Sequence, residues 1–126
     1  KMYTVKYQKY FNDYKNSQEE KKFYSLQEVA DWLFGMAAGE KYEKVMFFID
    51  PDRERKMEGR WLDSSCIHVC NHSDRYIYYV EQIEKNGVII YSCGTFTNME
   101  CHWNEEIKSW LRECRERMLH PTFNFG

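Results

Sequence analysis

The stretch SSCIHVCNHS, residues 64–73, places cysteine and histidine at alternating positions. Cys66, His68, Cys70 and His72 belong to the residue types that bind zinc, form disulfides, or act as nucleophile and base. Alternation is also the pattern of one face of a β-strand, because every second side chain of a strand points the same way. The spacing therefore allows three interpretations: a metal site, a redox pair, or a strand face.

Strand geometry favours the strand face. Residues two apart on a strand are separated by roughly 6.7 Å, so Cys66 and Cys70 would lie about 13 Å apart. A disulfide needs Cα atoms within about 7 Å, and zinc ligands lie only about 2.0–2.3 Å from the metal. Four positions along one straight strand cannot meet either condition. We therefore expect reduced cysteines here, with no metal and no other cofactor.

Nucleophilic catalysis needs a thiol or hydroxyl beside a base that is itself oriented. Residues 93–95, Cys-Gly-Thr, could be combined with His68 or His102 in this way. The sequence contains no nucleophile elbow, no phosphate-binding glycine loop and no helix motif of paired histidines. We therefore expect a protein that is not an enzyme, and keep a small hydrolase or zinc protein as the third hypothesis.

The composition is that of one folded domain spanning residues 1–126, with 43% hydrophobic and 30% charged residues. The formal charge of −2 does not suggest binding driven by phosphates. The longest apolar run, VMFFI, is too short to cross a membrane. Five cysteines, an odd number without framework spacing, favour reduced thiols and a cytoplasmic location.

Hydrophobic periodicity predicts the elements in the order β(β)αββββα. Strands are expected over 2–11, 43–50, 61–70, 75–83 and after Asn86-Gly87, with a short optional strand at Phe23 and Tyr24 after a polar excursion over 12–22. One helix starts at a Ser25–Glu28 capping box, and a second covers 102–118. The predicted fold class is α+β, a mainly antiparallel sheet of about five strands with two helices packed on one face.

Pairing the strands sorts their side chains onto two faces. A hairpin through residues 71–74 would put His68 opposite Ile77, and the Asn-Gly hairpin would put Ile83 opposite Ile90. We expect the row containing Ile67 and Val69 to face the helices. The other face would stay open and bind a partner, unless the N-terminal strand or the tail PTFNFG covers it. The predicted partner-binding residues are His68, Ile77, Tyr79, Ile90 and Phe96.

The alternative is a nucleic-acid-binding accessory domain, because the helix–three strands–helix order of the core resembles that of double-stranded RNA binders. The candidate phosphate-binding residues lie in the loop after Pro51, with support from basic residues of the second helix. They are Arg53, Arg55, Lys56 and Arg60. Asp52, Glu54 and Glu58 are interleaved with them and largely cancel their field.

Residues 101–126 resemble the C-terminal ends of small uncharacterised proteins carried on bacterial conjugative elements. The matching pieces are His102-Trp103, Trp110-Leu111, Cys114, Arg117 and PTFNF. The resemblance implies a bacterial cytoplasmic accessory protein and brings no catalytic residues with it. Our hypothesis is a non-catalytic protein that binds another protein or itself, possible homodimers included, and that inhibits a host factor on behalf of a mobile element.

Overall fold

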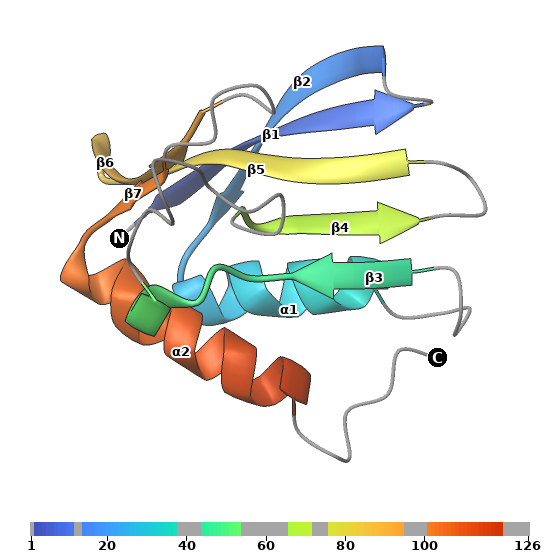
Figure 1. Ribbon diagram of the computed structural model, residues 1–126. Helices are drawn as coiled ribbons and strands as arrows, with labels where there is room; N and C mark the ends of the chain where they lie inside the picture. The colour runs from blue at the N-terminus through green and yellow to red at the C-terminus, as the bar shows by residue number, and fades with distance from the viewer. Residues whose placement is uncertain are drawn as a thin grey trace.

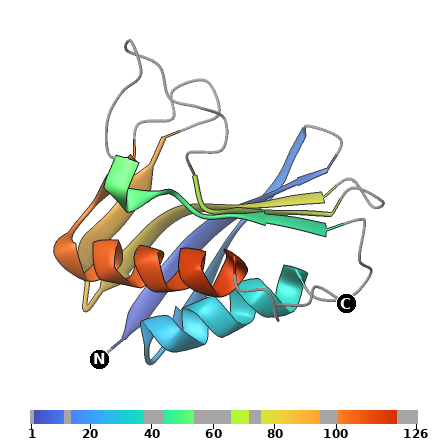
Figure 2. The ribbon, with the colours of Figure 1, turned by 60° about the horizontal axis from the view of Figure 1, so that its bottom comes forward.

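The computed structural model describes residues 2–11, 14–37, 44–53, 66–71, 76–94 and 101–119. Seven strands form one antiparallel sheet, and both helices lie on the same side of it (Figures 1 and 2). The predicted α+β class is confirmed. The elements are β1 (Tyr3–Phe11), β2 (Tyr14–Phe23), α1 (Leu26–Ala37), β3 (Lys44–Phe47), the 3-10 turn η1 (Pro51–Arg53), β4 (His68–Asn71), β5 (Tyr76–Lys85), β6 (Val88–Cys93), β7 (Cys101–Trp103) and α2 (Glu105–Leu119).

Strand β5 organises the sheet. It pairs with β1 along its whole length. On its other edge it pairs first with β4, over Tyr76–Tyr79, and then with β6, over Gln82–Lys85. Glu81 is an extra residue at this change of partner, because Val80 lies opposite Tyr7 while Gln82 lies opposite Lys6. Such a β-bulge shifts the alternation of side chains by one position.

Before the bulge, the predicted faces are correct. His68 lies opposite Tyr79 rather than Ile77, a displacement of two residues, which keeps every side chain on its predicted face. After the bulge, the prediction is wrong. Ile83 was placed with His68, but it pairs with Val5 and Tyr91 and is fully buried in the core. The extra residue Glu81 causes this change of face.

The Asn86-Gly87 hairpin is confirmed. Both residues have positive φ, 51° and 85°, as a type I′ turn requires. Lys85 and Val88 flank the turn as a pair, and Glu84 pairs with Ile89. A second irregularity follows at Ile90, so that Ile83 lies opposite Tyr91 instead of Ile90.

Two strands lie where the sequence predicts other structure. The polar excursion over 12–22 contains most of β2, which pairs with β1 and ends the sheet on that side. A strand at a sheet edge needs no apolar face, and charged residues there discourage pairing between molecules. Residues 102 and 103, predicted to be helical, belong to β7, which pairs with β6.

Both helices begin at side-chain caps. Ser25 Oγ accepts the amide of Glu28, as predicted, while the Glu28 carboxylate accepts the amide of Tyr24. The Asn104 side chain caps α2 by accepting the amide of Ile107 at 2.9 Å. The predicted apolar faces are buried, and neither helix of the described segments is long and apolar enough to cross a bilayer.

The helices are joined to each other at one aromatic contact region. Trp110 of α2 donates its indole N–H to the carbonyl of Leu26 at 2.9 Å. The Trp110 ring meets Phe48 edge-on, and Phe48 stacks on Phe34 of α1. Arg117 of α2 lies over the Phe34 ring, 4.0 Å from its centroid. These contacts fix α2 against α1 beneath the sheet.

Two isoleucines of the same hairpin test the change of face. Ile83 is 0% exposed and Ile89 is 56% exposed. We expect Ile83→Ala to lower the free energy of unfolding by about 2–5 kcal/mol, because it leaves a cavity in the core. The matched control, Ile89→Ala, should change it by no more than about 0.5 kcal/mol. Urea unfolding of both variants measures this, and equal effects would contradict the observed register.

Candidate functional site

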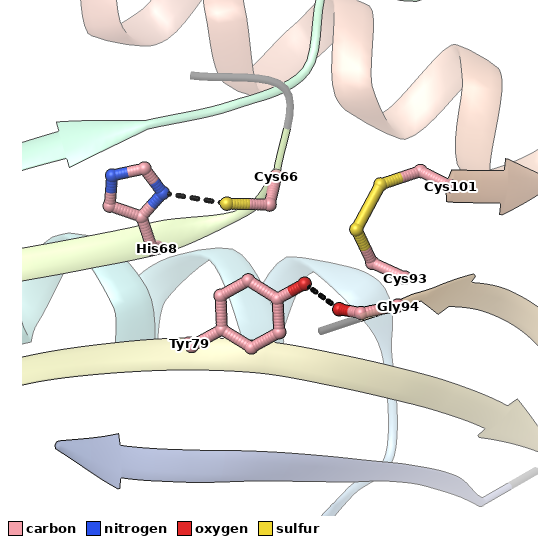
Figure 3. Close-up of a disulfide and its surroundings, with 6 residues drawn as sticks. All are labelled: Cys66, His68, Tyr79, Cys93, Gly94 and Cys101. Atoms are coloured by element: carbon pink, nitrogen blue, oxygen red, sulfur yellow. Dashed lines mark hydrogen bonds between the residues drawn. A yellow bond between two sulfur atoms is a disulfide. The ribbon is translucent and has the colours of Figure 1, made fainter. Parts of the chain in front are cut away.

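Cys66 and His68 form a hydrogen-bonded pair beside β4. The Cys66 sulfur lies 3.0 Å from Nδ1 of His68 (Figure 3). The thiol is 0% exposed and the imidazole 8% exposed. A thiol beside an imidazole is the arrangement of a nucleophile and its base, so its protonation decides what the pair can do.

Burial lowers the pKa of His68 from 6.5 to about 4, although a hydrogen bond to the Cys66 backbone acts in the opposite direction. The imidazole is therefore neutral at pH 7 and a weak base. A thiol has an ordinary pKa of about 8.5, so His68 cannot hold Cys66 as a thiolate. The pair satisfies two buried polar groups of the fold and gives no activated nucleophile.

Cys93 and Cys101 form a disulfide across β6 and β7 (Figure 3). The prediction that all five cysteines are reduced is therefore wrong for these two, while Cys66, Cys70 and Cys114 form no disulfide. No framework spacing of cysteines indicates this bridge, because it arises from the pairing of two short strands. Next to it, the Tyr79 hydroxyl donates a hydrogen bond to the carbonyl of Gly94.

The three cysteines outside the disulfide, Cys66, Cys70 and Cys114, are all buried. Burial raises the pKa of Cys70 and of Cys114. Within the described segments, no three side chains of His, Cys, Asp or Glu come close enough to hold a metal ion. His72 lies outside the described residues. The described cysteines therefore supply a disulfide and buried thiols.

The predicted partner-binding surface does not lie open. His68, Tyr79 and Ile90 are 8%, 1% and 6% exposed, and Ile77 is half-buried. Phe96 lies outside the described residues. Exposure was predicted from the lack of a third helix, and it is wrong for His68, Tyr79 and Ile90. At β4 the interior extends to both faces of the sheet, so His68 and Tyr79 contribute to the fold rather than to a docking surface.

Elsewhere the same face of the sheet is polar. Gln8 and Gln18 both donate side-chain hydrogen bonds to the Glu81 carboxylate, at 2.8 and 3.1 Å. Lys6 forms an ion pair with Glu84 at 3.4 Å. A face bonded in this way is typical of solvated sheet surface. The large apolar patch expected here is therefore absent from the described part of β1, β2 and β5.

The phosphate-binding alternative gains no support from the described residues. Arg53 ends η1, and Arg55, Lys56 and Arg60 lie outside the described residues. The arginines of α2 are engaged with groups of this protein. Arg112 binds Asp52 at 2.7 Å, Arg117 binds Asp31 at 2.8 Å, and Arg115 donates to the Phe48 carbonyl at 2.6 Å. Arg112 also holds the pKa of Asp52 below its ordinary value.

A groove between β6 and β7 is the site that sequence reasoning missed. Its cavity of about 250 Å³ is lined in part by Ile89, which is 56% exposed, and Val88, the preceding residue of β6, is 64% exposed. The available signal in the sequence was a pair of apolar residues directly after a hairpin turn. A turn lies at the end of a sheet, beyond the core that the helices cover, so apolar side chains next to it are exposed. The lining residues, together called the β6–β7 groove below, are Ile89, Ile90, Tyr91, Ser92, His102, Trp103 and Asn104.

The depressed pKa of His68 predicts acid sensitivity. Unfolded His68 takes up a proton near pH 6.5, whereas folded His68 does so only near pH 4. The contribution of neutral His68 to the free energy of unfolding is therefore fully present above pH 6.5, and it is lost as the pH falls from there towards 4. Between pH 7 and pH 5 we expect the free energy of unfolding to fall by roughly 2 kcal/mol from this group.

Urea unfolding at both pH values measures the effect, with His68→Gln as the control. The free energy of unfolding of the variant should change much less between pH 7 and pH 5, because the glutamine side chain does not titrate. A variant that retains the full pH dependence would show that His68 is not the responsible group.

Comparisons with known proteins identify no family for this chain. No family model matches it, and no curated protein or solved structure is significantly similar to it. The resemblance of residues 101–126 to proteins of conjugative elements therefore stays a prediction. The function has to be inferred from the groove, the buried Cys66–His68 pair and the disulfide.

Proposed function

We propose that this protein is a non-catalytic accessory protein that binds another protein through the β6–β7 groove. The observation that carries this proposal is the exposure of Ile89 in the wall of a cavity that Trp103 also lines, with Val88 exposed next to Ile89 in the chain. Adjacent exposed apolar side chains next to a concave site are typical of contact surfaces. Tryptophan is also among the residues that contribute most to binding energy.

The composition of the groove fits a protein partner. Ile89, Ile90 and Trp103 provide apolar contacts, while Ser92, His102 and Asn104 provide polar groups along the walls. This mixture, an apolar centre with a few polar groups at its rim, is the usual anatomy of a protein interface. The partner that fits it presents an apolar side chain from an extended or looped segment. A second copy of the chain is one such partner, so self-association belongs to the proposal.

The non-catalytic part of the proposal follows from protonation and access. The Cys66–His68 pair has the geometry of a nucleophile and base, but its sulfur is buried and its imidazole is a weak base. An activated nucleophile needs both an accessible position and a base with a pKa near the working pH. We therefore infer that the Cys66–His68 pair has a structural role rather than a catalytic one.

We further propose a bacterial cytoplasmic protein encoded by a mobile element that inhibits a host factor. Support comes from the C-terminal resemblance at His102-Trp103 and Trp110-Leu111. The location was inferred from reduced thiols, and the Cys93–Cys101 disulfide removes that part of its support. The nucleic-acid alternative is disfavoured, because Arg112 and Arg117 are paired with Asp52 and Asp31.

Charge substitution in the groove tests the proposal. We expect Ile89→Lys to weaken partner capture roughly tenfold or more, because it puts a charge into an apolar contact. The control is Leu119→Lys, which changes a comparably exposed residue, 68%, at the far end of α2. Both variants should unfold like the unsubstituted protein, since both positions are exposed.

Capture from a lysate of the native host, quantified by mass spectrometry, measures the difference, and light scattering reports self-association. Equal capture by the two variants would refute the groove as the binding site. Retention on heparin that weakens with salt would support the nucleic-acid alternative instead.

A further inference from the structure

We propose that the Cys93–Cys101 disulfide makes the β6–β7 groove redox-dependent, so that its reduction releases β7 while α2 stays in place. The role of this change in binding rests on the proposed function of the groove. The structural part, a local opening controlled by one disulfide, stands on the contacts of β6, β7 and α2 alone.

The disulfide lies at one end of a very short pair of strands. It joins the last residue of β6 to the first residue of β7. Three residue pairs connect the two strands: Tyr91 with Trp103, Ser92 with His102, and the cysteines themselves. At the other end, the amide of Asn104 donates to the carbonyl of Ile90 at 3.0 Å. A pair of strands this short is only marginally stable without further support.

The groove needs β7 to be in position. One wall is formed by residues 89–92 of β6, and the other by residues 102–104, which are the end of β7 and the cap of α2. In the described part of the sheet, β7 pairs with β6 and with no other strand. Loss of the pairing between β6 and β7 would therefore remove one wall of the groove.

Helix α2 has its own attachments, which do not depend on the disulfide. Trp110 bonds to the Leu26 carbonyl, and Arg112 binds Asp52. In the first turn, Glu106 accepts hydrogen bonds from Lys85, at 3.0 and 3.2 Å, and from the Tyr3 hydroxyl at 2.5 Å. These contacts tie α2 to α1, η1, β5 and β1. Opening of β7 should therefore stop at the start of α2.

The reaction requires a thiol reductant, such as a dithiol or a pool of monothiol of the glutathione class. Two reductant thiols supply two electrons and two protons. The bond between the sulfurs of Cys93 and Cys101 breaks, each sulfur becomes a thiol, and the two reductant sulfurs join in a disulfide. Attack proceeds through a mixed disulfide, so one sulfur must be reached first.

The two sulfurs of the disulfide are largely buried, and a local opening of the structure is enough to expose them. Cys93 and Cys101 are 5% and 6% exposed. Both lie at strand ends, where fraying opens the structure at low free-energy cost. The other cysteines, Cys66, Cys70 and Cys114, are already reduced. In the described segments, a reductant therefore changes one bond.

Hydrogen exchange with mass spectrometry tests the proposal without any partner. The full chain is compared before and after treatment with dithiothreitol. We expect amides of residues 101–104 to exchange about tenfold faster or more after reduction, because local opening governs their protection. Amides in the second half of α2 and in β1 should keep their rates. The double variant Cys93→Ser/Cys101→Ser should match the reduced protein and not respond to dithiothreitol.

Two results would overturn the proposal. Unchanged exchange of residues 101–104 would show that β7 stays paired without the bridge. Faster exchange throughout α2 and β1 would show that the disulfide supports the whole fold rather than one groove. If the double variant fails to fold, the oxidised and reduced wild-type samples still decide between these outcomes. The Ile89→Lys experiment is independent, so failure of the proposed function would be recognised separately.

Discussion

The extra residue at Glu81 is the constraint on which the rest of the sheet depends. One edge of β5 pairs with β4 up to this point and with β6 beyond it, while β1 follows the opposite edge throughout. Val80 and Ile83 lie on either side of the bulge. In a regular strand they would point to opposite faces of the sheet, but the extra residue turns both side chains into the core. The Glu81 carboxylate is held by Gln8 and Gln18 of β1 and β2. A single strand can thus serve two different neighbours on one edge.

This change of partner divides the helix layer as well. Helix α1 packs under the part of the sheet with β2, β3 and β4, and α2 packs near β6, β7 and η1 (Figure 2). Trp110 and Phe48 join the two halves. The helices therefore provide a rigid base, while the least supported strand, β7, lies at the margin of the sheet. Binding sites are commonly found on such margins of rigid scaffolds.

Local signals in the sequence predicted most of the fold. The Ser25 cap, the Asn86-Gly87 turn and the apolar face of α2 each depend on residues close in sequence, and the structure confirms them. The bulge at Glu81 could not be predicted, because an inserted residue leaves the alternation on either side intact. Strand β2 was expected only as a short segment at Phe23 and Tyr24, since the residues before them are polar and their pairing depends on β1 rather than on their own pattern.

The site was predicted less well, for a related reason. His68 and Tyr79 were correctly placed on one face, but whether a face is exposed depends on long-range packing that alternation does not record. The Cys93–Cys101 bridge depends on the register of two strands across residues 94–100, and β7 was expected to be helix. The cysteine count alone favoured thiols. The sequence therefore predicts which side chains lie close together only where it also predicts the pairing of the strands.

The edge strand β2 also bears on contacts between copies of this molecule. It pairs on one side with β1 and carries Glu19, Glu20, Lys21 and Lys22 in its exposed second half. Charged side chains on an edge strand discourage its pairing with another molecule, because they must give up part of their hydration when a second strand approaches. The charges therefore oppose growth of the sheet into fibrils. Neutral, β-branched replacements at these positions would favour edge-to-edge pairing between copies of the molecule.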